Sequence, residues 1–165
     1  MHSVALTGTG VFTPQNTITN DELVKAFNAY ADQFNAQNAG AIDAGDLNAV
    51  PHSSSDFILA ASGIQQRYVI DKIGILDPNI MHPIFPKRSD DDPSLMAEMA
   101  VDAVNKALAQ AGVDASDVDL VLCAASNMER AYPAIAVEIQ QLIGAGGMAF
   151  DMNVACSSAT FGIQT

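Results

Sequence analysis

Positively charged residues are scarce in this sequence, with 7 Lys and Arg against 19 Asp and Glu and a formal net charge of −12. The phosphate backbone of a nucleic acid is repelled by such a chain, so we expect no nucleic-acid partner. Long apolar runs are missing too, and no stretch approaches the roughly 18 residues of a membrane span. The N-terminus MHSVALTGTG lacks the basic start and cleavage site of a signal peptide. We therefore expect a cytoplasmic protein without a membrane partner.

Cysteine is also rare: the sequence contains two, Cys123 and Cys156. Cys123 lies in the apolar run DLVLCAA, which favours a buried, reduced thiol over half of a disulfide. His2, His52 and His82 lack the close spacing of zinc ligands, so we expect no metal site.

The chain nevertheless has enough apolar material for a core, because 49 % of its 165 residues are hydrophobic. Strand-like and helix-like segments alternate along it, with short connections, which favours a layered α/β fold with parallel strands. We predict an irregular or marginally helical segment at residues 31–52 and an extended loop at residues 73–88. The predicted strands lie in residues 4–12, 67–71, 119–126 and 147–154.

Four helices are predicted between these strands. The first is capped by Asn20, and the second runs from Ser54 to Ile64 and closes on Gly63. The third follows a cap at Asp92 and ends at Gly112, and the fourth lies in residues 132–144.

Cys156 follows the apolar strand FDMNV and has only small neighbours, Ala155, Ser157, Ser158 and Ala159. A thiol at the start of a helix is favoured as a thiolate by the helix dipole, and small neighbours let a thioester approach it. Backbone N–H groups at the same turn are placed to bind an oxyanion. From these residues alone, an activated nucleophile and a buried structural cysteine are equally good interpretations.

Several motifs resemble one family in order and spacing. They are GTGVFTP, ITNDELV, S-G-I-x-x-R-Y at 62–68, MAVDAVNKALAQAGVDASDVDLVLCAAS and AYPAIAVEIQQLIGAGGMAFDMNVACSSATFGIQ. Together they resemble the N-terminal half of the β-ketoacyl-acyl carrier protein synthase III family, within the thiolase superfamily of condensing enzymes. AFDMNVACSS is the most diagnostic of them, because it resembles the family's active-site segment.

The resemblance implies that residues 1–165 form the N-terminal half of a thiolase-like, pseudo-twofold αβαβα fold. The C-terminal half, with the family's His and Asn, would lie beyond Thr165, and we expect this fragment alone to be inactive. The implied enzyme is an acyltransferase of fatty acid biosynthesis with no permanently bound cofactor. Cys156 would take an acyl group from acyl-coenzyme A or acyl-acyl carrier protein, with its backbone N–H in the oxyanion hole. Decarboxylative condensation with malonyl-acyl carrier protein would then give a 3-ketoacyl product.

The resemblance also implies acyl carrier protein as a partner and a homodimer with the loop SNMERAYPA near its interface. Ser126, Tyr132 and Phe57 match positions around the substrate pocket, although Tyr132 is equally well placed to staple the start of a helix. For docking the acidic carrier protein, Arg67, Lys87 and Arg88 are the best local cations.

The sequence departs from the family's common pattern in ways that indicate an altered primer, such as a longer acyl chain. Residues 31–52 and 73–88 look like insertions. Phe57 and Ala61 stand where the family commonly has a Trp and an Arg that hold coenzyme A. Two alternatives remain open: condensation in secondary metabolism or head-to-head joining of acyl chains, and a non-catalytic partner subunit.

Overall fold

The computed structural model describes residues 4–89 and 91–165, which divide into two compact units. One unit contains Arg88–Thr165 together with the described part of residues 1–12, and the other is Thr13–Lys87. His2 lies outside the described residues. Within the described part of the chain, no helix combines the length and the apolar composition that crossing a bilayer requires.

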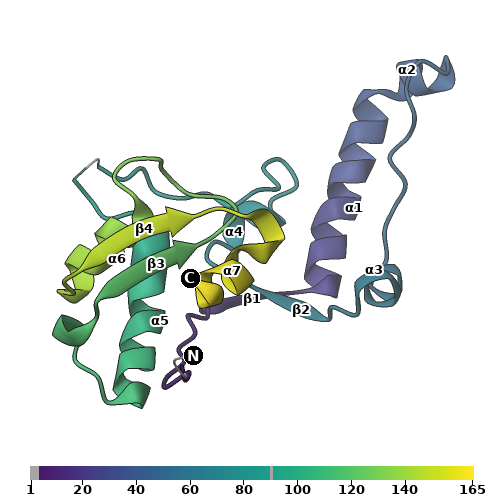
Figure 1. Ribbon diagram of the computed structural model, residues 1–165. Coiled ribbons are helices and arrows are strands. Elements are labelled where there is room, and N and C mark those ends of the chain that lie inside the picture. The colour runs from purple at the N-terminus through teal and green to yellow at the C-terminus, as the bar shows by residue number, and fades with distance from the viewer. Residues whose placement is uncertain (1–3, 90) are drawn as a thin grey trace. The chain divides into compact units, whose positions relative to one another are not determined.

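The first unit is built on two parallel strands, β3 (Leu120–Ala124) and β4 (Met148–Met152). Helix α6 (Ile135–Ile143) connects them and lies on one face, with α5 (Leu95–Ala111) packed against it, while α7 (Ser158–Gln164) lies on the other face (Figure 1). Two 3₁₀ turns complete the unit, η1 (Ala115–Asp117) and η2 (Ala155–Ser157). The predicted order of helices and parallel strands in this part of the chain is therefore confirmed.

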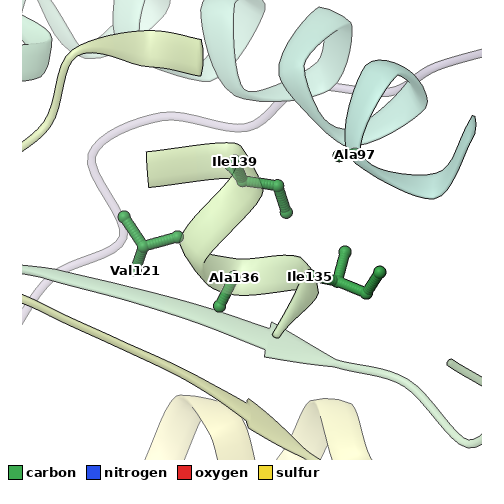
Figure 2. Packing of buried hydrophobic residues seen from close by; sticks show 5 residues of the cluster. All are labelled: Ala97, Val121, Ile135, Ala136 and Ile139. Carbon is green, nitrogen blue, oxygen red and sulfur yellow. The ribbon is translucent and has the colours of Figure 1, made fainter. Parts of the chain in front are cut away.

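The core of this unit lies between α5, α6 and β3, as Figure 2 shows. Ile135 is fully buried and Ile139 is almost so, because the apolar residues of α6 recur on the side that faces the sheet. Full burial of each such side chain contributes about 1.5–3 kcal/mol. The cluster consists of Ala97, Val121, Ile135, Ala136 and Ile139.

The strand predicted for residues 4–12 is wrong: this segment is extended but has no strand pairing among the described residues. It lies instead along α5, where a side chain at Gly8 would place a Cβ 2.2 Å from the carbonyl oxygen of Ala107. The backbone N–H of Thr9 donates to the Gln110 side chain at 2.6 Å. The backbone of residues 4–12 thus bonds to a side chain of α5 rather than to a neighbouring strand.

The second unit contains an antiparallel pair of strands, β1 (Asn16–Thr19) and β2 (Gln66–Val69). Its helices are α1 (Asn20–Gln37), α2 (Ala39–Asp43), α3 (Ser55–Ser62) and α4 (Ile73–Leu76). The helix predicted from Ser54 to Ile64 and the strand after it are confirmed.

Helical residues occur both in the segment predicted as irregular or marginally helical, which includes α2, and in the segment predicted as an extended loop. Residues 31–37 continue α1, because aromatic side chains keep helical spacing through Phe34, whose ring centre lies 6.0 Å from that of Tyr30. Within 73–88, the chain makes the single turn of α4 before it becomes irregular. Whether 31–52 and 73–88 are insertions stays a prediction.

Side chains of α1 hold the segment that follows α2. Asn28 both donates to the carbonyl and accepts from the N–H of Ser53, at 3.1 and 2.8 Å. Asn35 makes the same pair of bonds with Val50, at 2.9 and 2.8 Å. Asp71 accepts hydrogen bonds from three backbone N–H groups around α4, those of Ile73, Gly74 and Ile84.

The predicted caps at Asn20 and Asp92 are wrong. Thr19 caps α1 through a reciprocal capping box with Glu22, and Asn20 is instead buried with its amide donating to the carbonyl of Ile64. Ser94 caps α5 by accepting from the N–H of Ala97 at 3.1 Å. The predicted ends at Gly63 and Gly112 are confirmed, and both glycines adopt a positive φ.

Glycine is required at position 147, immediately before β4. Its φ is +73°, and a Cβ there would lie 1.9 Å from the carbonyl oxygen of Asp119. We expect Gly147→Ala to lower the free energy of unfolding by at least about 2 kcal/mol, measured by urea denaturation. Gly146→Ala is the matched control, because nothing lies within 4 Å of the place that its added methyl group would take. Equal stabilities of the two variants would contradict this account of the turn.

The Glu22 carboxylate makes the stability of the fold depend on pH, and this dependence can be tested. Hydrogen bonds from Lys72, 2.6 Å away, and from Thr19 lower the pKa of Glu22 from 4.5 to about 2. Because the folded-state pKa is lowered, this contribution to stability is fully present above pH 4.5 and is lost as the pH falls through about 2. NMR titration of the Glu22 carboxyl should give that low midpoint. In Lys72→Met the pKa of Glu22 should rise toward 4.5, and an unchanged midpoint would rule out Lys72 as the main cause.

Candidate active site

Cys156 lies on a turn between a strand and a helix. Strand β4 ends at Met152, and the chain passes through the 3₁₀ turn Ala155–Ser157 into α7. The predicted strand-to-helix elbow is therefore confirmed, although the thiol lies in the turn that precedes α7 and not in its first helical turn. Cys156 is exposed within this chain, which favours an accessible thiol over a buried structural cysteine.

The backbone of this elbow is strained at Ala155, which has a φ of +48°. Asn153 supports the turn from one side, since its side-chain oxygen accepts from the N–H of Ala155 at 3.2 Å. Its amide nitrogen also donates to the carbonyl of Ser126 at 3.2 Å. Ser126 follows β3, so the structure brings this predicted pocket residue to within one hydrogen bond of the Cys156 segment.

Asp151 on β4 anchors helix α6 to the sheet. Its two carboxylate oxygens accept from the backbone N–H groups of Ile135 and Ala136, at 2.9 and 2.8 Å. A negative charge at the start of a helix is favoured by the helix dipole. The sequence reasoning missed this residue, and the available signal was a carboxylate inside an otherwise apolar strand, which needs polar partners.

Cys123 lies on β3 directly opposite Asp151 in the strand register. It is half-buried, and both burial and the nearby Asp151 carboxylate raise the pKa of this thiol above its usual 9.0. Both cysteines are free, as the sequence predicted. A raised pKa disfavours the thiolate, so Cys123 is a poor nucleophile, whereas Cys156 is the exposed cysteine of this chain.

The loop of residues 126–134 is held by an ion pair to α6 and a hydrogen bond from the backbone of α5. Arg130 lies 3.4 Å from the buried carboxylate of Glu138 and donates to the carbonyl of Asp92. The Glu129 carboxylate accepts from the N–H of Met96 at 2.9 Å, in the first turn of α5. Tyr132 is nevertheless 90 % exposed, so the interpretation of this residue as a helix staple is wrong.

The remaining predicted residues lie in separate places. Phe57 is on α3 in the second unit and is 66 % exposed. Arg88 is paired with Glu98 in the first unit, and Arg67 donates to Asn20 in the second. Among residues 4–89 and 91–165, no group of three or more His, Cys, Asp or Glu side chains is arranged to hold a metal ion.

Two curated proteins from bacteria are similar in sequence to this chain. A β-ketodecanoyl-acyl carrier protein synthase of Pseudomonas aeruginosa is 55 % identical over 141 residues, covering 86 % of this chain and 40 % of that protein. A β-ketoacyl-acyl carrier protein synthase III of Granulibacter bethesdensis is 30 % identical over 160 residues, covering 96 % of this chain and 36 % of that protein. The chain belongs to the β-ketoacyl-acyl carrier protein synthase III family. No family model matches it.

A solved structure has the same fold as this chain. The 3-oxoacyl-acyl carrier protein synthase III from Aquifex aeolicus superposes with a TM-score of 0.65 at 22 % identity, covering 96 % of this chain and 37 % of that one. The fold is therefore the N-terminal half of the thiolase-like architecture, as the sequence predicted. The chain spans about 40 % or less of the length of these family members.

The hydrogen bonds from α6 to Asp151 predict that substitution of this residue destabilises the fold. We expect Asp151→Asn to lower the free energy of unfolding by about 1–3 kcal/mol, because one backbone N–H of α6 then faces an amide NH₂ instead of a carboxylate oxygen. Urea denaturation measures the change. Asp117→Asn removes a charge from an exposed 3₁₀ turn and should have little effect. If both substitutions cost the same, Asp151 does not anchor α6.

Proposed function

We propose that the full-length protein containing this chain is a 3-ketoacyl-acyl carrier protein synthase of fatty acid biosynthesis, with Cys156 as the nucleophile that accepts the acyl group. The observation that carries the proposal is an exposed thiol on a strained strand-to-helix elbow in a chain of this family. Accessibility and small neighbours are what acyl transfer from a thioester requires.

The reaction has two halves. The Cys156 thiolate attacks the carbonyl carbon of an acyl thioester, and the carrier thiol leaves. The backbone N–H of Cys156, which no hydrogen bond engages within the described residues, is available to stabilise the oxyanion. Malonyl-acyl carrier protein then loses carbon dioxide, and its carbanion attacks the acyl carbon. This attack releases the Cys156 thiolate and a 3-ketoacyl-acyl carrier protein.

The primer is proposed to be an eight-carbon acyl group. A condensation with malonyl adds two carbons, so a β-ketodecanoyl product, as named for the relative from Pseudomonas aeruginosa, requires an octanoyl primer. Phe57 and Ala61, which stand in place of the family's common Trp and Arg, are consistent with a primer other than acetyl-coenzyme A. The donor is octanoyl-coenzyme A or octanoyl-acyl carrier protein.

The remaining features of the proposal follow the family. The partner is acyl carrier protein, no cofactor stays bound, and the protein acts as a cytoplasmic homodimer. The exposed Tyr132, on a loop held by Arg130 and Glu129, supports an interface at residues 126–134. Ser126 and Tyr132 are proposed to line the substrate pocket, and Phe57 to contact the donor. No observation favours the head-to-head, secondary-metabolite or non-catalytic alternatives.

Intact-mass analysis of the full-length protein tests the nucleophile and the primer together. After incubation with acetyl, octanoyl and decanoyl thioesters of coenzyme A and of acyl carrier protein, we expect a mass gain of one octanoyl group, mapped by peptide analysis to Cys156. Cys156→Ala should show no adduct and no 3-ketodecanoyl product when malonyl-acyl carrier protein is added.

The matched control is Cys123→Ala, which removes the other thiol and should retain both the adduct and the product. Absence of an adduct with every donor, in a folded protein, would favour the non-catalytic subunit. An adduct formed only with the acetyl donors would contradict the proposed octanoyl primer but would still support Cys156 as the nucleophile.

A further inference from the structure

Ser158, the first residue of α7, is the one small neighbour of Cys156 that is buried, with 3 % of its surface exposed. Its hydroxyl donates to the carbonyl oxygen of Ala155 at 2.8 Å and accepts from the N–H of Val154 at 2.9 Å. The two bonds therefore connect the start of the helix to the backbone on both sides of the Ala155 Cα atom.

The backbone conformation of Ala155, which lies between these two hydrogen bonds, is unfavourable by itself. Ala155 has a φ of +48°, which costs an L-residue other than glycine about 1–2 kcal/mol. Two hydrogen bonds to a buried hydroxyl offset a cost of that size. Ser158 therefore helps to stabilise the positive φ of Ala155, together with Asn153, which accepts from the Ala155 N–H.

The consequence for Cys156 follows from the planarity of the peptide bond. The carbonyl of Ala155 and the N–H of Cys156 belong to the same peptide unit, and in a trans peptide they point in opposite directions. When the Ser158 hydroxyl binds that carbonyl, it also fixes the direction of the Cys156 N–H.

We propose that Ser158 is a positioning residue, whose hydroxyl orients the Ala155–Cys156 peptide so that the Cys156 N–H can bind the oxyanion formed during acyl transfer. This inference rests on the proposed function, in which that N–H is the oxyanion donor. Its effect should appear in acyl transfer, which develops an oxyanion, and not in simple alkylation of the thiol, which develops none.

The test compares two rates at Cys156 in the full-length protein. One is single-turnover acylation by saturating octanoyl thioester, followed by intact mass, and the other is alkylation by iodoacetamide. In Ser158→Ala we expect acylation to slow by about tenfold or more, while alkylation changes by less than about threefold. Ser157→Ala is the matched control, because Ser157 is exposed, its side chain makes no capping hydrogen bond at the start of α7, and alanine keeps a small residue beside Cys156. Both of its rates should match those of the unmodified protein.

A second pair of variants separates the hydroxyl from the shape of the side chain. The threonine of Ser158→Thr and the valine of Ser158→Val have almost the same volume, but only threonine keeps the hydroxyl. We expect Thr to acylate faster than Val by about tenfold, and this comparison decides the matter if Ser158→Ala fails to fold.

Three results would overturn the positioning role. They are an unchanged acylation rate in Ser158→Ala, a parallel loss of acylation and alkylation, and equal rates in the Thr and Val variants. In each of these cases the proposed function still stands, provided that the unmodified protein is acylated. If the unmodified protein accepts no acyl group from any donor, the proposed function fails and the role of Ser158 fails with it.

Discussion

The two hydrogen bonds that Asp151 accepts from the start of α6 set the geometry on which the rest of the first unit depends. They join the second strand to the helix that connects the two strands, so helix position and strand register are determined together. Cys156 lies only a few residues further along the chain. The elbow that follows has its own support from Asn153, which bonds to Ser126 and Ala155.

The small neighbours of Cys156 differ in their physical roles. Ser158 is buried and bonded to backbone, whereas Ser157 is exposed and leaves the approach to the thiol open. Further along α7, Gly162 allows close packing on β3, because a Cβ there would lie 2.8 Å from the Leu122 side chain. A pattern of small residues thus combines access to the sulfur, support of its backbone and contact of the helix with the sheet.

Much of the first unit could be predicted from sequence because its signals are local. Apolar runs of strand length gave β3 and β4, and Gly112 marked the end of α5. The role of residues 4–12 could not be predicted, since the same β-branched and glycine-rich pattern suits a strand and an extended segment along a helix. The contacts of Asp151 and Ser158 were also out of reach, because each depends on where the fold places a distant or strained backbone group.

In the second unit, side chains of α1 hold the chain at two places, after α2 and immediately before α4. Asn28 and Asn35 bind the chain after α2, while Glu22 near the start of α1 pairs with Lys72 immediately before α4. In chimaera design, the chain between α2 and α3 would have to move together with α1, because the Asn28 and Asn35 side chains hold the backbone of Ser53 and Val50.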